Sequence, residues 1–156
     1  MRKDKLTCIA VDDEPMALKL ILGYIGKTPF LELKHSFSNA IEALEFFNTT
    51  PVDIMFLDIQ MPDLSGMELS KIVKGKTKVI FTTAFDRYAL EGFKVDALDY
   101  LLKPFNYGEF LNSAQKAYNW IQVADKSVFV KHTDLNKDFL FVKSGYKQIK
   151  LELRKI

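Results

Sequence analysis

Short apolar segments alternate with helical segments along most of this sequence, and the alternation limits the folds open to the chain. Five segments rich in Val, Ile and Phe have the length and composition of buried strands; they lie near residues 6–11, 31–37, 52–57, 77–82 and 98–102. Apolar side chains recur at helical spacing in the intervening segments. The pattern predicts βαβ units, and therefore an α/β fold with a doubly wound, five-stranded parallel sheet flanked by five helices.

Two of these helices can be placed from local signals. Ser38 or Asn39 is a candidate N-cap for a helix whose apolar stripe runs from Ile41 to Phe47. The last helix is expected to begin near Tyr107 and to run through Ile121.

Charge and residue pattern both change after residue 125. Residues 1–125 carry 14 Lys and Arg against 17 Asp and Glu, whereas residues 126–156 carry 8 against 3, so a basic segment follows an acidic domain. Within that segment, FLFVKSGYKQIKLEL alternates apolar and polar residues, which predicts a β-hairpin or paired strands. A single hairpin is marginally stable in water, so we expect this segment to open a second, basic, β-rich domain.

Polar side chains stand where four of the predicted strands end. In a doubly wound sheet the carboxyl ends of neighbouring strands meet at one crevice, so residues far apart in sequence can share a site there. Taken alone, each of these residues is most simply a solvated polar group at a strand end. Only the whole set of strand-end residues predicts a functional site. The set comprises Asp12, Asp13, Asp58, Thr82, Thr83 and Lys103.

This set has the chemistry of a phosphoryl-transfer site. Carboxylates held together raise one another's pKa unless a cation lies among them, and Mg²⁺ suits such oxygen ligands. With a metal bound, one carboxylate becomes a candidate nucleophile toward a phosphoryl group. The transfer then needs mainly positioning and charge neutralisation, which Lys103 and a Thr hydroxyl can supply. We therefore expect Asp58 to be phosphorylated.

Four motifs resemble the receiver domain of two-component response regulators, in that family's order and spacing. They are VDDEP (11–15), FLDIQMPDLSG (56–66), FTTAF (81–85) and ALDYLLKPF (97–105). The resemblance implies a flavodoxin-like receiver over residues 1–124 that accepts a phosphoryl group from a sensor histidine kinase. Such a domain is a regulatory phosphoacceptor and not an enzyme with its own substrate.

The resemblance also assigns residues to the metal site. It implies that Asp58 is the phosphoacceptor and that Asp12 and Asp13 form the acidic pair, with Asp13 a direct Mg²⁺ ligand. It further implies that Asp58 contributes to the metal site and that the main-chain carbonyl of Gln60 is another ligand.

A second group of residues is implied to transmit the signal. Thr83 corresponds to the switch hydroxyl, and Tyr100 to the aromatic ring that turns inward after phosphorylation. Lys103 corresponds to the cation that pairs with the phosphate, and the Lys103–Pro104 bond is usually cis in that family. Strand alternation alone leaves Tyr100 open between a core and a switch position. Phe85 is expected to shield the phosphate from water and to slow its hydrolysis.

The segment TAFDRYALEGFKVDALDYLLKPF and the C-terminal FLFVKSGYKQIKLEL resemble the LytR/AlgR group, whose output is a LytTR-type DNA-binding domain. This implies a linker at 125–137 and the truncated start of the output domain at 138–156. DNA would be bound only through the full-length output domain. A homodimer is expected through the face formed by helix 4, strand 5 and helix 5, where aromatic residues gather: Tyr88, Phe93, Tyr107, Tyr118 and Trp120.

Two alternatives remain open on sequence alone. An aspartyl-phosphate hydrolase of the haloacid-dehalogenase type also places a nucleophilic Asp after an apolar strand, but its pattern has a second Asp two positions on, where this chain has Gln60. An adaptor that is never phosphorylated would act through its helix surface alone.

The cysteine content and the amino end indicate a cytoplasmic protein without a membrane partner. Cys8, the single cysteine, cannot form an internal disulfide. The apolar run that follows MRKDK is cut off at Asp12, too short for a signal peptide or a membrane span.

Overall fold

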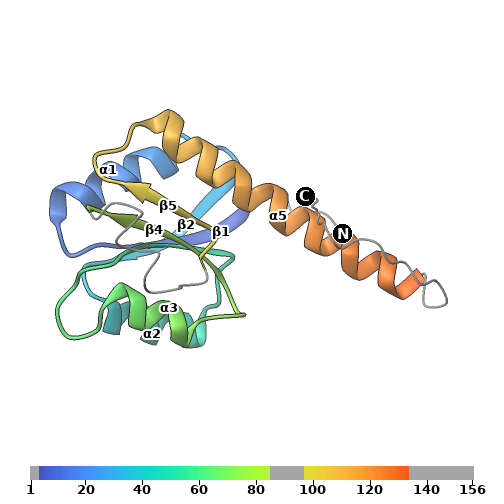
Figure 1. Ribbon diagram of the computed structural model, residues 1–156, viewed down its shortest axis with the longest axis horizontal. Helices are drawn as coiled ribbons and strands as arrows, with labels where there is room; N and C mark the ends of the chain where they lie inside the picture. Colours follow the sequence, from blue (N-terminus) through green and yellow to red (C-terminus); the bar gives the residue numbers. More distant parts are fainter. Residues whose placement is uncertain (1–3, 85–96, 134–156) are drawn as a thin grey trace. The chain divides into compact units, whose positions relative to one another are not determined.

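The computed structural model describes residues 4–84 and 97–133, with side chains to residue 123, and shows one parallel sheet with helices on both faces (Figure 1). The strands follow the order β2-β1-β3-β4-β5. They are β1 (Leu6–Val11), β2 (Leu31–Phe37), β3 (Ile54–Asp58), β4 (Lys78–Thr83) and β5 (Asp99–Leu102). The helices are α1 (Pro15–Gly26), α2 (Ala40–Thr49), α3 (Gly66–Ile72) and α5 (Tyr107–Thr133).

The predicted doubly wound, five-stranded parallel sheet is confirmed, with strand bounds close to those expected. Four of the five predicted helices lie in the described part of the chain, and the segment 85–96, where the remaining one was expected, lies outside it. The last helix begins at Tyr107 as predicted but extends past Ile121 to Thr133. Helical structure therefore covers much of the predicted linker at 125–137, and the division into domains stays a prediction.

Local residues fix where the helices start, through a proline in the first turn or through capping hydrogen bonds. Pro15 occupies the first turn of α1, where its missing N–H costs nothing. At α2 the Asn39 side chain accepts the Glu42 N–H at 2.8 Å, which selects Asn39 over Ser38 as the cap. A capping box between Ser65 and Glu68 opens α3.

Alternating residues of the central strands build two apolar cores, one on each face of the sheet. Figure 1 shows the helices that cover these faces. Met55 and Leu57 of β3 pack toward α2 and α3, whereas Ile54 and Phe56 pack toward α1 and α5. All four side chains are at most 1% exposed. Because β3 is buried on both faces, a charged residue at its end is expected only where the sheet opens to a site.

The strand order creates that opening. Chain connections leave β1 and β3 in opposite directions, so a crevice forms beyond the carboxyl ends of these two neighbours. Residues 2–122 form one compact unit around this sheet. Among the described residues, no helix has the length and apolar character needed to cross a membrane.

Candidate functional site

The acidic residues predicted from the strand ends lie together at this crevice. Asp58 is the last residue of β3, and Asp12 follows the last residue of β1; the two strands pair beside them. Carboxylate oxygens of Asp12, Asp13 and Asp58 lie within 4.8 Å of one another. Asp12 and Asp58 are buried at 3% and 7% exposure, whereas Asp13 is exposed. The cluster thus has one side open to solvent.

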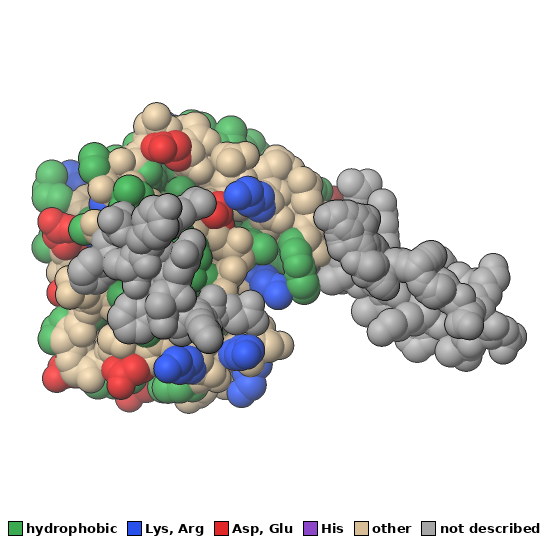
Figure 2. Space-filling model, in the orientation of Figure 1, with side chains coloured by type: hydrophobic (Ala, Val, Ile, Leu, Met, Phe, Trp, Pro, Cys, Tyr) green, Lys and Arg blue, Asp and Glu red, His purple; other side chains and the backbone are tan. Residues whose placement is uncertain are grey.

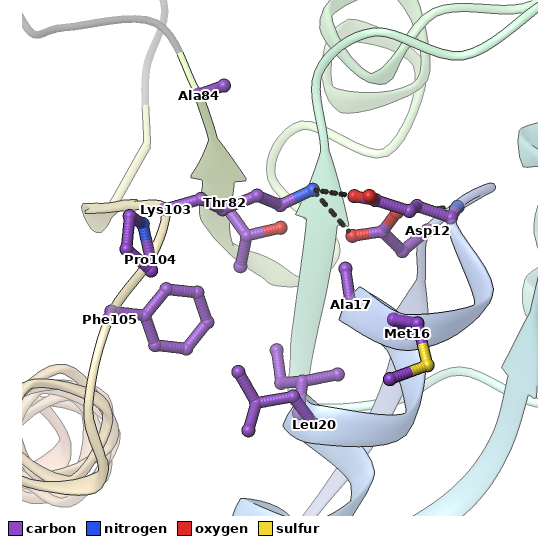
Figure 3. A pocket seen from close by; sticks show the side chains of 11 residues that line it. Asp12, Met16, Ala17, Leu20, Thr82, Ala84, Lys103, Pro104 and Phe105 are labelled. Carbon is purple, nitrogen blue, oxygen red and sulfur yellow. Dashed lines mark hydrogen bonds and ion pairs between the residues drawn. The ribbon is translucent and has the colours of Figure 1, made fainter.

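Lys103 provides the positive charge of the site. Its Nζ lies 2.9 Å from Asp12 Oδ2, 3.5 Å from Asp58 Oδ1 and 3.9 Å from Glu14 Oε1. Figure 3 shows the side chain extended from beside Pro104 toward Asp12. The Lys103–Pro104 bond is cis, as the resemblance implied, and the Lys103 N–H donates to the Thr83 carbonyl at 2.7 Å. Both the ammonium and its backbone are therefore held in place.

Burial and negative charge together perturb these groups. Burial, and then the charge of Asp12, raise the pKa of Asp58 to about 7, although Lys103 opposes the shift. Burial would lower the pKa of Lys103, but its hydrogen bond to Asp12 and the surrounding carboxylates raise it. Without a cation, Asp58 is therefore only partly ionised at neutral pH, while Lys103 remains protonated.

These side chains fit a divalent cation. Three carboxylates face one ammonium, so negative charge is in excess, and burial together with the charge of Asp12 raises the pKa of Asp58. Oxygen donors with one exposed side suit Mg²⁺, which keeps part of its water shell. Gln60 lies in the exposed loop two residues after Asp58, and the role of its carbonyl as a ligand stays a prediction.

The two threonines at the end of β4 lie on opposite faces of the sheet. Thr82 lines a cavity beside α1 and Lys103 (Figure 3), whereas alternation places Thr83 on the face of Phe81, toward α2 and α3. Tyr100 packs on that same face, its ring 5.6 Å from the ring of Phe81. Tyr100 is therefore half-buried on the Thr83 side of the sheet, and its role as a switch stays a prediction.

Two residues of this site were not singled out from sequence. Gly66 donates its N–H to the Ile59 carbonyl at 2.8 Å, and a Cβ at this position would lie 2.0 Å from the Asp58 carbonyl oxygen. Only glycine permits the chain after β3 to return so closely. The Gly after Ser65 in the capping box was the available signal. The second residue, Glu14, reaches Lys103 from the start of α1.

A cavity of about 520 Å³ adjoins the acidic cluster, between α1 and the chain that follows β5. Its walls include Met16, Leu20 and Phe105, as Figure 3 shows. Met16 is 74% exposed and Leu20 is 42% exposed, so this apolar surface borders the charged site directly.

Comparison with known proteins identifies this arrangement. The profile of the response regulator receiver domain matches residues 8–115. A Vibrio cholerae protein described as an uncharacterized response regulatory protein is 36% identical over 124 residues, covering 78% of this chain and 52% of the relative. The sensory transduction protein LytT of Bacillus cereus is 37% identical over 114 residues, covering 71% and 46%. The chain spans about half the length of these curated relatives.

A solved structure gives the same result. The response regulatory domain of protein mrkE from Klebsiella pneumoniae superposes with a TM-score of 0.67 at 32% identity, covering 73% of this chain and 96% of that domain. The matched region contains all four polar strand ends described above. This chain belongs to the response regulator receiver domain family.

Proposed function

We propose that Asp58 accepts a phosphoryl group from the phosphohistidine of a sensor kinase, in the presence of Mg²⁺. One observation carries the proposal: a buried carboxylate ends β3 with two further carboxylates within 4.8 Å and the Lys103 ammonium at 3.5 Å. A buried carboxylate with a pKa near 7 changes its charge near neutral pH, and a bound cation would stabilise its ionised form.

Asp13, Asp58 and the Gln60 carbonyl would hold the metal, with Asp12 completing the acidic pair. Mg²⁺ would neutralise negative charge on these carboxylates and on the transferred oxygens. An ionised Asp58 oxygen forms the new P–O bond, the P–N bond of the donor breaks, and its electron pair stays on the imidazole. Lys103 is already held beside Asp58 and supplies a charge to the phosphoryl oxygens.

The apolar wall next to the site provides a surface for the kinase. Any protein donor must bring its phosphohistidine to the open side of the cluster, so it must also contact what surrounds that opening. Met16 and Leu20 are exposed there on successive turns of α1. We propose that a helical face of the kinase covers them, since exposed apolar side chains beside a reacting group gain free energy only when a partner buries them.

Phosphorylation of Asp58 would cause a conformational change that passes through β4 and β5. Thr83 ends β4 beside the residue paired with Asp58, and Tyr100 lies on the same face. Asp99, which precedes Tyr100, accepts hydrogen bonds from Ser113 and Lys116 of α5, the latter at 3.3 Å. A shift of Tyr100 toward the Thr83 side would therefore alter the contacts of Asp99 with α5.

The effect of that shift is proposed to be dimerisation through the face formed by the expected fourth helix, β5 and α5, and control of an attached output domain. The similarity to the sensory transduction protein LytT favours a LytTR-type output. We further propose that 125–137 is a linker and that 138–156 is the beginning of the DNA-binding domain. DNA would then be bound only by the complete output domain, and the protein would act in the cytoplasm.

A small phosphodonor tests the proposal without the kinase. With Mg²⁺, the intact mass should increase by one phosphoryl group, and the increase should disappear in EDTA and in Asp58→Asn. An unchanged mass would instead support the adaptor that is never phosphorylated. Turnover of a phosphate monoester with release of free phosphate would revive the hydrolase alternative, which the family match does not favour.

A further inference from the structure

A polar recess lies at the opposite end of the sheet from Asp58. It has a volume of about 150 Å³ and is lined by Ser70 of α3, the turn that follows α3, the start of β4, the two residues before β5 and Trp120 of α5. Lys78 and Thr83 are the first and last residues of β4, so the recess and the phosphoacceptor edge are separated by roughly 16 Å along the strand. The recess therefore belongs to no part of the site already described.

The chain around this recess is strongly basic. Lys71, Lys74, Lys76 and Lys78 fall within eight consecutive residues, and no acidic residue occurs between Glu68 and Asp86. Lys and Arg side chains gather at the lower right of the face in Figure 2, near the position of α3 in Figure 1. Two of the four lysines, Lys74 and Lys78, line the recess itself.

Neither of these two ammonium groups pairs with a carboxylate in the described part of the chain. Lys78 Nζ instead lies over the ring of Trp120, 3.5 Å from its centroid. The Trp120 side chain is 46% exposed. The positive charge at the recess is thus held in place by an aromatic ring and remains available to an anion.

A buried hydroxyl adds a directional donor. Thr77 Oγ1 is shielded from solvent and has no hydrogen-bond partner among the residues described. An unpaired buried polar group is costly, so a native fold normally supplies a partner from protein, water or ligand. Ser70 Oγ, which also lines the recess, donates to the Met67 carbonyl at 2.7 Å and keeps its acceptor capacity.

We propose that this recess binds a phosphate group. Lys74, Lys78 and Thr77 all line a space the size of a few water molecules, and the unpaired Thr77 hydroxyl would turn into it to donate to a bound group. This combination suits a compact oxyanion with several acceptor oxygens. An extended nucleic-acid backbone would instead contact all four lysines of the surface and would not enter a recess of this size. The site is separate from phosphorylation of Asp58 and does not depend on it.

Trp120 is the single tryptophan of the chain, so its fluorescence reports directly on the recess. The full chain would be titrated in EDTA with inorganic phosphate, and in parallel with a nucleoside monophosphate and with chloride at equal ionic strength. We expect a saturable change with phosphate that chloride does not produce, in both the wild type and Asp58→Asn. The monophosphate arm shows whether the group is bound free or as part of a larger ligand.

Matched variants separate the recess from general surface charge. Lys74→Gln should weaken phosphate binding about tenfold, since it removes one charge-assisted hydrogen bond, whereas Lys76→Gln on the same turn should leave affinity nearly unchanged. Thr77→Val keeps the side-chain shape; it should weaken binding without lowering thermal stability.

Three results would overturn the proposal. The first is a fluorescence change that chloride reproduces, and the second is an equal loss of affinity in Lys74→Gln and Lys76→Gln. The third is binding of a short DNA duplex without binding of either small phosphate, which would assign the four lysines to a nucleic-acid surface. None of these outcomes bears on phosphoryl transfer, which the mass increase at Asp58 tests independently.

Discussion

Replacing Asp58 by asparagine should stabilise the metal-free protein at alkaline pH, although it removes the proposed phosphoacceptor. Burial and the charge of Asp12 raise the pKa of Asp58 from 3.8 to about 7 against the opposing effect of Lys103. A shift of this size corresponds to roughly 4 kcal/mol by which the fold disfavours the ionised carboxylate. Asparagine has nearly the same shape without the charge, so the variant escapes this cost.

The sign of the pH dependence follows from proton binding. The folded protein binds the Asp58 proton more tightly than the unfolded chain does, so folding is favoured at low pH. The free energy of unfolding of the wild type should fall as pH rises from about 4 to about 7 and then level off. Because Asp58→Asn lacks this slope, its advantage should grow over the same interval and reach about 2–4 kcal/mol at alkaline pH.

Urea unfolding in EDTA at several pH values, followed by Trp120 fluorescence and circular dichroism, measures this difference. Asp63→Asn serves as the matched control, because Asp63 is an exposed carboxylate in the loop after β3 and asparagine tolerates its positive φ of 69°. Saturating Mg²⁺ should stabilise the wild type by about 3 kcal/mol at a hundred times its Kd, and the variant by much less. A wild type more stable than Asp58→Asn in EDTA at pH 8.5 would refute the reasoning.

Three further perturbations test other parts of the site. Gly66→Ala should destabilise the fold by about 3 kcal/mol in thermal melts, because its Cβ would overlap the Asp58 carbonyl oxygen. The control Gly23→Ala, in α1 with open space around it, should stabilise by up to about 1 kcal/mol. Equal effects of the two substitutions would contradict the close approach of Gly66 to Asp58. Lys103→Gln should raise the pKa of Asp58 further and slow phosphorylation by a small donor at least about tenfold, read as the rate of mass increase; an unchanged rate would remove Lys103 from the mechanism. Leu20→Glu should slow transfer from a kinase about tenfold while leaving phosphorylation by a small donor unchanged, and equal slowing of both would argue against a docking surface.

Much of the fold could be predicted because its signals are local and repeated. Buried parallel strands carry continuous apolar runs, so β1 and β3 were visible as segments, and their alternation with helices required a parallel sheet. The extension of α5 to Thr133 was missed, because the apolar stripe weakens after Ile121 and the charged residues that follow favour a linker reading. Helix propensity in such a segment carries little periodic signal.

The members of the site could be predicted, but their relations could not. Strand ends placed Asp12, Asp58 and Lys103 at one edge, since parallel strands share their carboxyl ends. The face of the sheet on which Tyr100 lies could be assigned only from the register of β4 and β5, in which Phe81 pairs with Tyr100. The need for Gly66 arises from a contact with backbone eight residues earlier, which appears only once the loop is closed.

The central claim is that Asp58 receives a phosphoryl group beside a cation held by the acidic cluster. A crystal structure of this chain with Mg²⁺ and beryllofluoride tests it most directly. We predict the beryllium on an Asp58 oxygen, Lys103 contacting a fluoride, and the metal bound by the Asp13 and Asp58 carboxylates. A metal that binds elsewhere, or an Asp58 side chain left unmodified with Mg²⁺ and beryllofluoride in excess, would contradict the claim.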